Sequence, residues 1–290
     1  MTEYSERYFR SKDGLRLHYR YYAGTAQRTP VLCIPGLTRN SRDFDSVAAH
    51  IALRRPVLCS DLRGRGQSDY DSNWENYTVA VERDDVVQLL ETENIRRVIV
   101  LGTSRGGIVA MALAATHHSR LAGVILNDIG AQLEASGLAR IMEMLGRKFE
   151  YRDWHEAALA LKEANQGSFL DVGDAGWMGF AKAIYRNSGD RIVPDYDLNL
   201  AKALRGKESS NRPAPAENVK LWPLFGALNG IPVLLLRGAN SDLLSEETAT
   251  KMGVFKPDMA IVTVDKRGHV PFLDEPEAVA AIDKFLQEIG

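Results

Sequence analysis

Short runs of apolar residues, rich in β-branched side chains, alternate along the chain with longer segments that mix apolar and polar positions. The hydrophobicity within each run is nearly continuous, which is typical of parallel strands buried on both faces. The segments between the runs have the length of helices, and this alternation favours an α/β fold with a mostly parallel sheet flanked by helices. The predicted strands are residues 31–34, 56–60, 97–101, 121–126, 231–236 and 259–264, and the predicted helices are residues 41–53, 79–92, 105–117, 245–252 and 276–289.

The beginning of the chain has a different pattern, which predicts a hairpin. Residues 7–10 and 15–22 flank the dipeptide Asp13-Gly14, and Asp-Gly between two strand-like segments is a strong turn signal. We therefore expect the sheet to start with an antiparallel pair and to contain about eight strands in all.

Residues 131–218 interrupt the alternation of strands and helices. This segment has helical periodicity, turn-rich patches and many aromatic residues, but it has no clear buried strand. We interpret it as a helical lid inserted into an α/β core that is formed by residues 1–130 and 219–290. A separate second domain is the alternative, because a prior of roughly 150 residues per domain allows both arrangements.

Composition and charge exclude several classes of protein. Apolar residues make up 45% and charged residues 26%, as in ordinary globular proteins, and the net charge of −2 gives no electrostatic footprint for nucleic acid. No apolar run approaches the roughly 18 residues of a membrane-spanning helix, and the polar start does not resemble a signal peptide. Two cysteines, Cys33 and Cys59, are too few for a disulfide scaffold or a four-ligand zinc site. We expect a cytoplasmic protein with a small-molecule substrate and with neither a nucleic-acid nor a membrane partner; the sequence does not indicate its oligomeric state.

The strongest chemical motif is the sequence GTSRG at residues 102–106. It follows one predicted strand and precedes an Ala-rich predicted helix, the setting in which a G-x-S-x-G motif forms a nucleophile elbow. The glycines permit a turn that is too tight for neighbouring Cβ atoms, and this turn lifts the hydroxyl of Ser104 above the sheet at a helix N-terminus. The motif therefore predicts that Ser104 is a nucleophile.

A serine nucleophile needs a base and a group that orients the base. Of the six histidines, His269 lies in the loop between the last predicted strand and the last predicted helix. Sites in α/β folds are built from loops at the carboxyl ends of parallel strands, which favours His269 as the base. Asp242 and Asp128 both follow predicted strands, and the order Ser…Asp…His suits either. We prefer Asp242, because its loop is longer and nearer to His269 in the chain, and we keep Asp128 as the alternative acid.

Several motifs, taken in order, resemble those of the α/β-hydrolase superfamily over nearly the whole chain except the predicted lid. Residues 34–37 read IPGL and resemble the oxyanion loop, with Pro35 in place of the usual histidine. Residues 61–69 read DLRGRGQSD and resemble the superfamily's D-x-x-G-x-G-x-S loop, and residues 268–276 resemble its histidine loop. The resemblance places Asp242 at the usual position of the acid and implies a member with a serine nucleophile, similar to esterases and lactonases.

The implied reaction needs no metal or organic cofactor. Ser104 would attack a small carboxylic ester or lactone, His269 would act as base and then acid, and the backbone N–H groups of Leu37 and Arg105 would form the oxyanion hole. The same residues would also serve a C–C bond hydrolase or a cofactor-free perhydrolase. A low-turnover ligand receptor of the same fold is a further alternative, because the fold alone does not determine the function.

The sequence contains fewer clues to the substrate. Trp154, Trp177 and Tyr185 suggest an apolar pocket, although aromatic residues at helical spacing are also typical of a lid core. Arg39 and Arg105 follow the predicted oxyanion loop and the nucleophile, where two guanidinium groups could hold a substrate carboxylate. The alternative is that a neighbouring carboxylate of the protein pairs with one of them.

Overall fold

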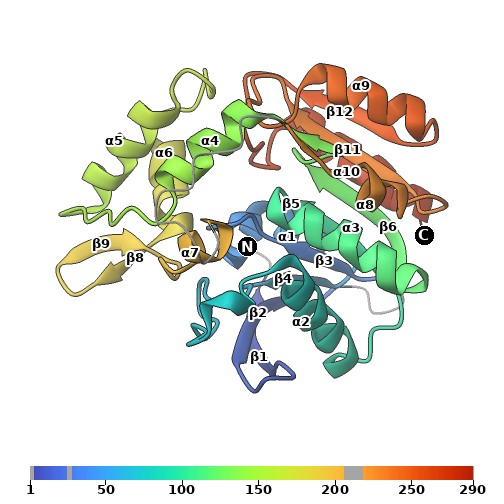
Figure 1. Ribbon diagram of the computed structural model, residues 1–290, viewed down its shortest axis with the longest axis horizontal. Helices are drawn as coiled ribbons and strands as arrows, with labels where there is room; N and C mark the ends of the chain where they lie inside the picture. Colours follow the sequence, from blue (N-terminus) through green and yellow to red (C-terminus); the bar gives the residue numbers. More distant parts are fainter. Residues whose placement is uncertain (1–2, 25–27, 206–217, 290) are drawn as a thin grey trace.

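The central element of the molecule is an eight-stranded sheet (Figure 1). The computed structural model describes residues 3–24, 28–205 and 218–289. The strands follow the order β1-β2-β4-β3-β5-β6-β11-β12 from one edge of the sheet to the other. Their bounds are β1 Tyr4–Arg10, β2 Arg16–Tyr22, β3 Val31–Ile34, β4 Val57–Ser60, β5 Val98–Thr103, β6 Leu121–Asn127, β11 Val233–Gly238 and β12 Ala260–Val264.

The strand directions confirm the predicted α/β architecture with an antiparallel start. β1 pairs with β2 and β2 pairs with β4 in antiparallel fashion, whereas the remaining neighbours in the sheet are parallel. Gly14 turns the chain between β1 and β2 with a φ of +91°, which glycine adopts because it has no Cβ. Because the later strands are parallel, the loops that carry the chemical motifs leave the sheet at the same edge.

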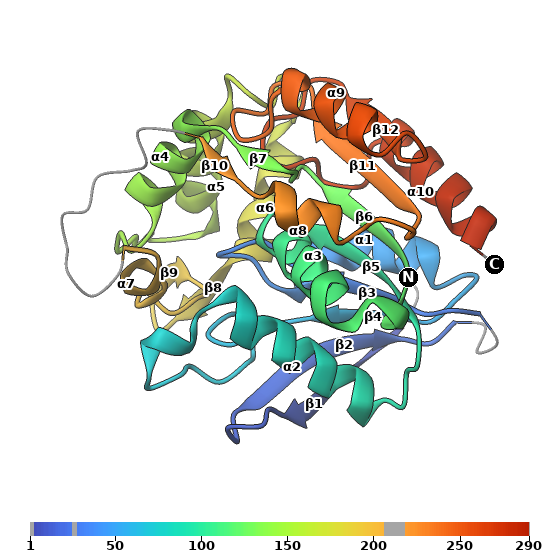
Figure 2. The ribbon, with the colours of Figure 1, turned by 45° about the vertical axis from the view of Figure 1, so that its right-hand side comes forward.

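Helices cover both faces of the sheet (Figures 1 and 2). Successive residues of one strand join opposite layers, as Leu32 and Cys33 do, so both faces are buried and the hydrophobic runs are continuous. Cys33 and Cys59 are free thiols. They lie opposite each other in the register of β3 and β4, and both are buried in one of these layers. That layer contains α1 (Asp45–Ile51) and α10 (Pro276–Ile289), and the other contains α2 (Val79–Thr92), α3 (Arg105–His117), α8 (Trp222–Gly226) and α9 (Glu246–Phe255).

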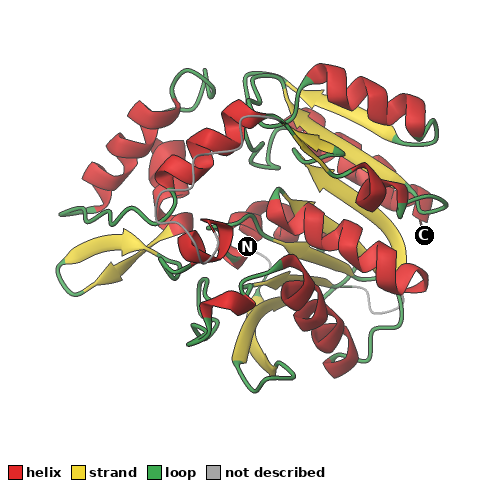
Figure 3. Ribbon diagram, viewed as in Figure 1, coloured by secondary structure: helices red, strands yellow, loops and turns green. Residues whose placement is uncertain are grey.

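The segment between β6 and β11 adds helices and a hairpin beside the sheet (Figure 3). Besides helices, the segment that we interpreted as a helical lid contains two short antiparallel strand pairs that the sequence analysis did not predict, β7 with β10 and the hairpin of β8 and β9. The turn between them contains Gly189-Asp190, with a φ of +65° at Gly189, and this dipeptide is itself a hairpin signal. Residues 206–217 of the predicted lid lie outside the described residues. The elements are β7 (Gln132–Leu133), α4 (Ala135–Met144), α5 (Trp154–Asn165), α6 (Asp174–Ile184), β8 (Tyr185–Ser188), β9 (Arg191–Pro194), α7 (Leu200–Arg205) and β10 (Val219–Lys220).

This segment has a small hydrophobic core of its own. Leu161 of α5, Trp177 of α6 and Tyr185 of β8 are buried together, and Phe272 from the loop after β12 packs against them. Phe272 stacks on Phe169 with 5.2 Å between the ring centroids. The segment is therefore seated on the edge of the sheet from which the histidine loop emerges. Among the described helices, none combines the length and the apolar character needed to cross a membrane.

Candidate active site

Ser104 lies in a sharp turn between β5 and α3, as the motif predicts. Its backbone has a φ of +50°, which is strained for a residue with a side chain. The turn brings the start of α3 against the end of β3: a Cβ on Gly106 would lie only 2.0 Å from the carbonyl oxygen of Ile34. Glycine at residue 106 is therefore required by this close approach, and the serine is held at the N-terminus of α3.

The side chain of Ser104 meets His269. Ser104 Oγ lies 2.9 Å from His269 Nε2, and His269 Nδ1 lies 2.7 Å from Asp128 Oδ2. The tautomer with a proton on Nδ1 satisfies both contacts, because Nδ1–H then donates to the carboxylate and Nε2 accepts from the hydroxyl. The structure thus joins a serine hydroxyl, an imidazole and a carboxylate in one hydrogen-bonded chain, which is the arrangement of a catalytic triad.

Asp128 directly follows β6 and is fully buried. Its Oδ1 accepts a hydrogen bond from the backbone N–H of Gly238 at 2.9 Å, and its Oδ2 accepts one from Ser241 Oγ at 2.5 Å. Both donors come from the end of the neighbouring strand β11 and the loop beyond it. The carboxylate is therefore held in a fixed orientation toward His269.

The preference for Asp242 as the partner of His269 does not agree with this geometry. Asp242 instead accepts two hydrogen bonds from Arg140 of α4, from Nε at 2.6 Å and from Nη2 at 2.8 Å. Burial alone would raise the pKa of Asp242, but Arg140 outweighs this effect and holds the pKa below its ordinary value. Loop length and nearness in the chain did not decide the partner, because β6 and β11 are neighbours and both strand ends lie beside the histidine loop.

A cavity of about 210 Å³ opens at Ser104 and His269. Its core side is formed by residues that include Leu37, Arg39 and Ser104. Its other walls come from the inserted segment and are largely apolar, with Ile141, Met144, Phe149, Phe180, Ile184 and Tyr185 among the lining residues. The cavity therefore offers an apolar space adjacent to the hydroxyl of Ser104.

The residues suggested as substrate contacts are only partly found in this cavity. Arg39 and Tyr185 line it, but neither Trp154 nor Trp177 is among the described residues that do so. Trp177 is 2% exposed and belongs to the core of the inserted segment, and Trp154 packs against that core. Trp154 and Trp177 therefore pack in the core of the inserted segment, as the alternative interpretation of these aromatic residues had it.

The two arginines suggested as anion-binding groups already have carboxylate partners. Arg39 Nε lies 2.6 Å from Asp43 Oδ2, and the guanidinium stands 4.3 Å from the ring centroid of Phe180. Arg105 Nε lies 2.7 Å from Glu82 Oε2. The paired guanidiniums do not form the free anion-binding pair that the sequence suggested.

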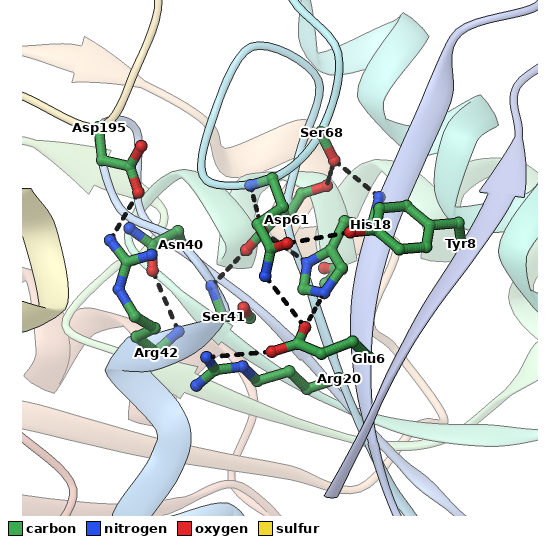
Figure 4. Close-up of polar contacts among 12 residues, drawn as sticks. Glu6, Tyr8, His18, Arg20, Asn40, Ser41, Arg42, Asp61, Ser68 and Asp195 are labelled. Carbon is green, nitrogen blue, oxygen red and sulfur yellow. Dashed lines mark hydrogen bonds and ion pairs between the residues drawn. The ribbon is translucent and has the colours of Figure 1, made fainter. Parts of the chain in front are cut away.

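The residues just after the predicted oxyanion loop connect it to the inserted segment. Asn40 Nδ2 and Arg42 Nε both donate to the carbonyl oxygen of Ala183 near the end of α6, at 2.9 and 3.0 Å. Arg42 also pairs with Asp195 at 2.6 Å, as Figure 4 shows. A cation at a helix C-terminus complements the helix dipole, so these contacts stabilise α6 against the core.

The motif at residues 61–69 contacts the same loop through Asp61 (Figure 4). Asp61 Oδ1 accepts a hydrogen bond from the backbone N–H of Ser41 at 2.6 Å, and its Oδ2 lies 2.7 Å from His18 Nδ1. His18 also contacts Glu6. Burial opposes ionisation of Asp61, but His18 and the N–H donors hold its pKa below the ordinary value. Asp61 is thus an ionised, buried support for the loop, and it is not among the described residues that line the cavity at Ser104.

Comparison with known proteins agrees with the fold and the motifs. A family model described as the alpha/beta hydrolase family matches residues 31–282. This chain belongs to the α/β-hydrolase family. The hydrolase is similar to an α/β hydrolase of known structure from Novosphingobium aromaticivorans, with 42% identity, coverage of 99% of each chain and a TM-score of 0.91.

Two curated relatives of the hydrolase are named as a hydrolase and an esterase. It is 32% identical to the 3-hydroxybutyrate-oligomer hydrolase of Cupriavidus necator, over 93% of this chain and 92% of that relative. It is 27% identical to the pimeloyl-(acyl-carrier protein) methyl ester esterase of Neisseria meningitidis, over 87% of this chain and 91% of that relative. The hydrolase is therefore an enzyme, and its relatives support ester hydrolysis.

Proposed function

We propose that this enzyme cleaves a small carboxylic ester through an acyl-enzyme on Ser104, with His269 as the base and Asp128 as the group that orients it. The observation that carries the proposal is the chain of contacts from Ser104 through His269 to Asp128, at 2.9 and 2.7 Å. These distances are those that a serine nucleophile and its base require. Asp242 is not part of the proposed triad, because Arg140 engages its carboxylate.

The proposed reaction has two halves. Ser104 Oγ attacks the ester carbonyl while its proton moves to His269 Nε2, and Asp128 stabilises the imidazolium that forms. His269 then gives this proton to the departing alkoxide, so that the C–O bond breaks, an alcohol leaves and Ser104 is acylated. In the second half water attacks the acyl carbonyl, its proton passes to His269, and the carboxylic acid leaves as the proton returns to Ser104.

The negative charge of each tetrahedral intermediate is stabilised by the backbone N–H groups of Leu37 and Arg105. Leu37 lines the cavity beside Ser104, and Arg105 is the first residue of α3, where the helix dipole favours an anion. Each such donor contributes about 3 kcal/mol to transition-state stabilisation in serine hydrolases. Because these donors are main-chain groups, their position depends on the backbone of the loop after β3. Contacts of Asn40, Arg42 and Asp61 hold this loop in place.

The cavity favours a short, mostly apolar acyl group. Its volume of about 210 Å³ and its apolar walls suit an acyl chain of a few carbons better than a long fatty acid. Residues 140–196 of the inserted segment supply most of these walls, so we assign the segment at residues 131–218 the role of a lid that selects the acyl group. A short ester of a hydroxy acid, such as a 3-hydroxybutyrate dimer, is a fitting test substrate because of the relative in Cupriavidus necator. The pairing of Arg39 and Arg105 removes the support for a requirement for a carboxylate-bearing substrate.

The proposed function is tested by steady-state turnover of aryl esters with acyl chains of graded length, together with a 3-hydroxybutyrate dimer. The wild-type enzyme should hydrolyse short-chain esters, and Ser104→Ala should reduce kcat to the background rate while preserving the fold by circular dichroism. Equal turnover by the wild type and Ser104→Ala would overturn the assignment of the nucleophile.

A further inference from the structure

A fully buried carboxylate stands between the two segments that carry the proposed oxyanion donors. Glu82, in the first turns of α2, forms ion pairs with two arginines: Oε1 lies 2.9 Å from Arg65 Nη2, and Oε2 lies 2.7 Å from Arg105 Nε. The side chains of Glu82 and Arg65 are 0% exposed, and that of Arg105 is 12% exposed. We refer to Arg65, Glu82 and Arg105 as the Glu82 cluster.

One arm of the cluster reaches the loop that contains the first donor. Arg65 Nε donates to the carbonyl oxygen of Leu37 at 2.8 Å, and Arg65 Nη1 donates to the carbonyl oxygen of Arg63 at 2.6 Å. The guanidinium is planar and its donors are fixed relative to one another, so contacts on three sides determine its orientation. Arg65 thereby fixes the backbone of Leu37 relative to Glu82.

The other arm reaches the segment that contains the second donor. Arg105 directly follows Ser104, and its guanidinium contacts Glu82 through Nε and the carbonyl oxygen of Tyr77 through Nη2, at 3.4 Å. The first turn of α3 is thereby fixed to the start of α2. Because Glu82 contacts both arginines, its side chain links the loop that contains Leu37 to the first turn of α3.

The charges of the cluster do not cancel. Two guanidiniums and one carboxylate leave a net charge of +1, and of the three side chains only that of Arg105 is partly exposed. Burial would raise the pKa of Glu82, but Arg105 and Arg65 outweigh this and hold the pKa below its ordinary value, so the carboxylate is ionised. Buried ionic groups of this kind are costly compared with apolar packing, which makes a role beyond stability worth testing.

We propose that Glu82 is a positioning residue that aligns the two halves of the oxyanion hole, through Arg65 on the carbonyl of Leu37 and through Arg105 at the start of α3. This inference rests on the proposed function, because it assumes that the N–H groups of Leu37 and Arg105 receive the oxyanion. It assigns Glu82 no contact with the substrate: the residue acts through backbone geometry. Donors that are aligned before the reaction stabilise the oxyanion without reorganisation, and this is the property that Glu82 maintains.

Positioning and simple electrostatics predict opposite effects for Glu82→Gln. Removal of the carboxylate charge leaves two guanidiniums near the oxyanion, and on electrostatic grounds alone this added positive charge would raise kcat. Loss of alignment lowers kcat, because the two N–H groups no longer point at the same atom. The sign of the change in kcat therefore separates the two roles.

The chain provides a matched control on the same helix. Asp85 of α2 is a buried carboxylate that accepts two hydrogen bonds from the buried Arg63, both at 2.7 Å. Its side chain contacts neither Leu37 nor Arg105 in the described interactions. Asp85→Asn should therefore destabilise the protein as Glu82→Gln does, with kcat unchanged.

The experiment measures kcat and KM on a short aryl ester and the inhibition constant of an aryl boronic acid, whose tetrahedral adduct on the serine mimics the intermediate. Glu82→Gln should lower kcat about tenfold or more and raise the inhibition constant of the boronic acid by a similar factor, with KM nearly unchanged. Arg65→Lys keeps the positive charge but cannot contact Glu82, Leu37 and Arg63 at the same time. It should give the same pattern, and it decides the question where Glu82→Gln does not fold. The positioning role would be overturned if Glu82→Gln, or Arg65→Lys in its place, had the same kcat and the same boronic acid affinity as Asp85→Asn. An inactive wild-type enzyme would instead overturn the proposed function.

Discussion

His269 Nδ1 lies 2.7 Å from Asp128 Oδ2, which joins the loop after β12 to the end of β6 across the intervening strand β11. The carboxylate is held in turn by the backbone N–H of Gly238 and by the hydroxyl of Ser241, both from the β11 side. The imidazole is thus oriented by an acid whose own orientation is fixed by the sheet. Asp128 and Asp242 both lie between Ser104 and His269 in the chain, so the order of residues does not separate them. Their contacts do, because Asp128 contacts His269 and Asp242 contacts Arg140.

The two aspartates can be separated by matched amide substitutions. Asp128→Asn should lower kcat by about 10³- to 10⁴-fold, because the amide favours the wrong tautomer of His269. Asp242→Asn should change kcat by less than about tenfold, because it breaks only the ion pair with Arg140. Steady-state kinetics on a short aryl ester measure both effects. A larger loss of kcat in Asp242→Asn than in Asp128→Asn would contradict the assignment.

Arg105 should not discriminate between charged and neutral substrates. Because its guanidinium is engaged by Glu82, Arg105→Met should reduce kcat/KM by the same factor for a neutral ester and for an ester that carries a carboxylate. The ratio of the two kcat/KM values measures this directly. A loss confined to the carboxylate-bearing ester would restore Arg105 to the role of an anion-binding residue.

The width of the cavity should set the preferred acyl chain. Ile184 lines the cavity at the end of α6, so Ile184→Ala should enlarge it and shift the optimum of kcat/KM toward longer acyl chains. Trp177→Phe on the same helix is the control, because Trp177 is buried in the core of the inserted segment. It should lower the melting temperature and leave the optimum unchanged. An unchanged optimum in Ile184→Ala would argue against the acyl group occupying this cavity.

Two glycines should respond in opposite ways to the same substitution. Gly106→Ala places a Cβ 2.0 Å from the carbonyl oxygen of Ile34, so the free energy of unfolding should fall by more than about 2 kcal/mol, with loss of activity. At Gly179 on the exposed side of α6 nothing lies within 4 Å of the added Cβ. Gly179→Ala should therefore stabilise the protein by roughly 0.5–1 kcal/mol. Denaturant unfolding measures both, and a neutral effect at Gly106 would be inconsistent with the close approach of α3 to β3.

Asp13 should contribute to stability in a defined range of pH. Its hydrogen bonds with Arg63 are the main reason that its pKa falls from 3.8 to about 2 in the folded protein. A carboxyl group with a lowered pKa in the folded state stabilises that state above its unfolded pKa, and this contribution is lost as the pH falls through the folded value. Asp13→Asn should therefore be less stable than the wild type at pH 6, and the difference should shrink as the pH falls below about 4 and disappear only below about 2. Denaturant unfolding at a series of pH values gives this difference, and a difference at pH 2 as large as that at pH 6 would exclude the proposed linkage.

The sequence predicted much of the fold because its strands are buried on both faces. Strands such as β3 and β5 appear as continuous apolar runs, and the helices α2, α3 and α10 begin and end at the predicted residues. The hairpin of β8 and β9 was missed because its exposed strands alternate too briefly to compete with helical periodicity. Its Gly189-Asp190 turn was nevertheless a usable signal.

The contact between Ser104 and His269 could be anticipated because each residue lies in a local motif, whereas the carboxylate partner of His269 depends on which strands are neighbours. Asp128 directly follows a strand, but its contact with His269 depends on the order of β6, β11 and β12, which the chain order does not give. The ion pair of Arg105 with Glu82 likewise depends on the packing of α2 beside α3, which the chain order does not give. Glu82 could have been noticed, since it lies at helical spacing from Val86 and Leu89 on the buried side of α2, where an unpaired carboxylate would be costly.

The central claim is that Ser104 is a nucleophile activated by His269 and Asp128, and the rate of fluorophosphonate labelling tests it most directly. Peptide mass spectrometry should locate the adduct on Ser104 in the wild type, and the labelling rate should fall by at least about 10²-fold in Asp128→Asn but remain nearly unchanged in Asp242→Asn. An adduct on another residue, or equal labelling rates in the wild type and Asp128→Asn, would contradict the account.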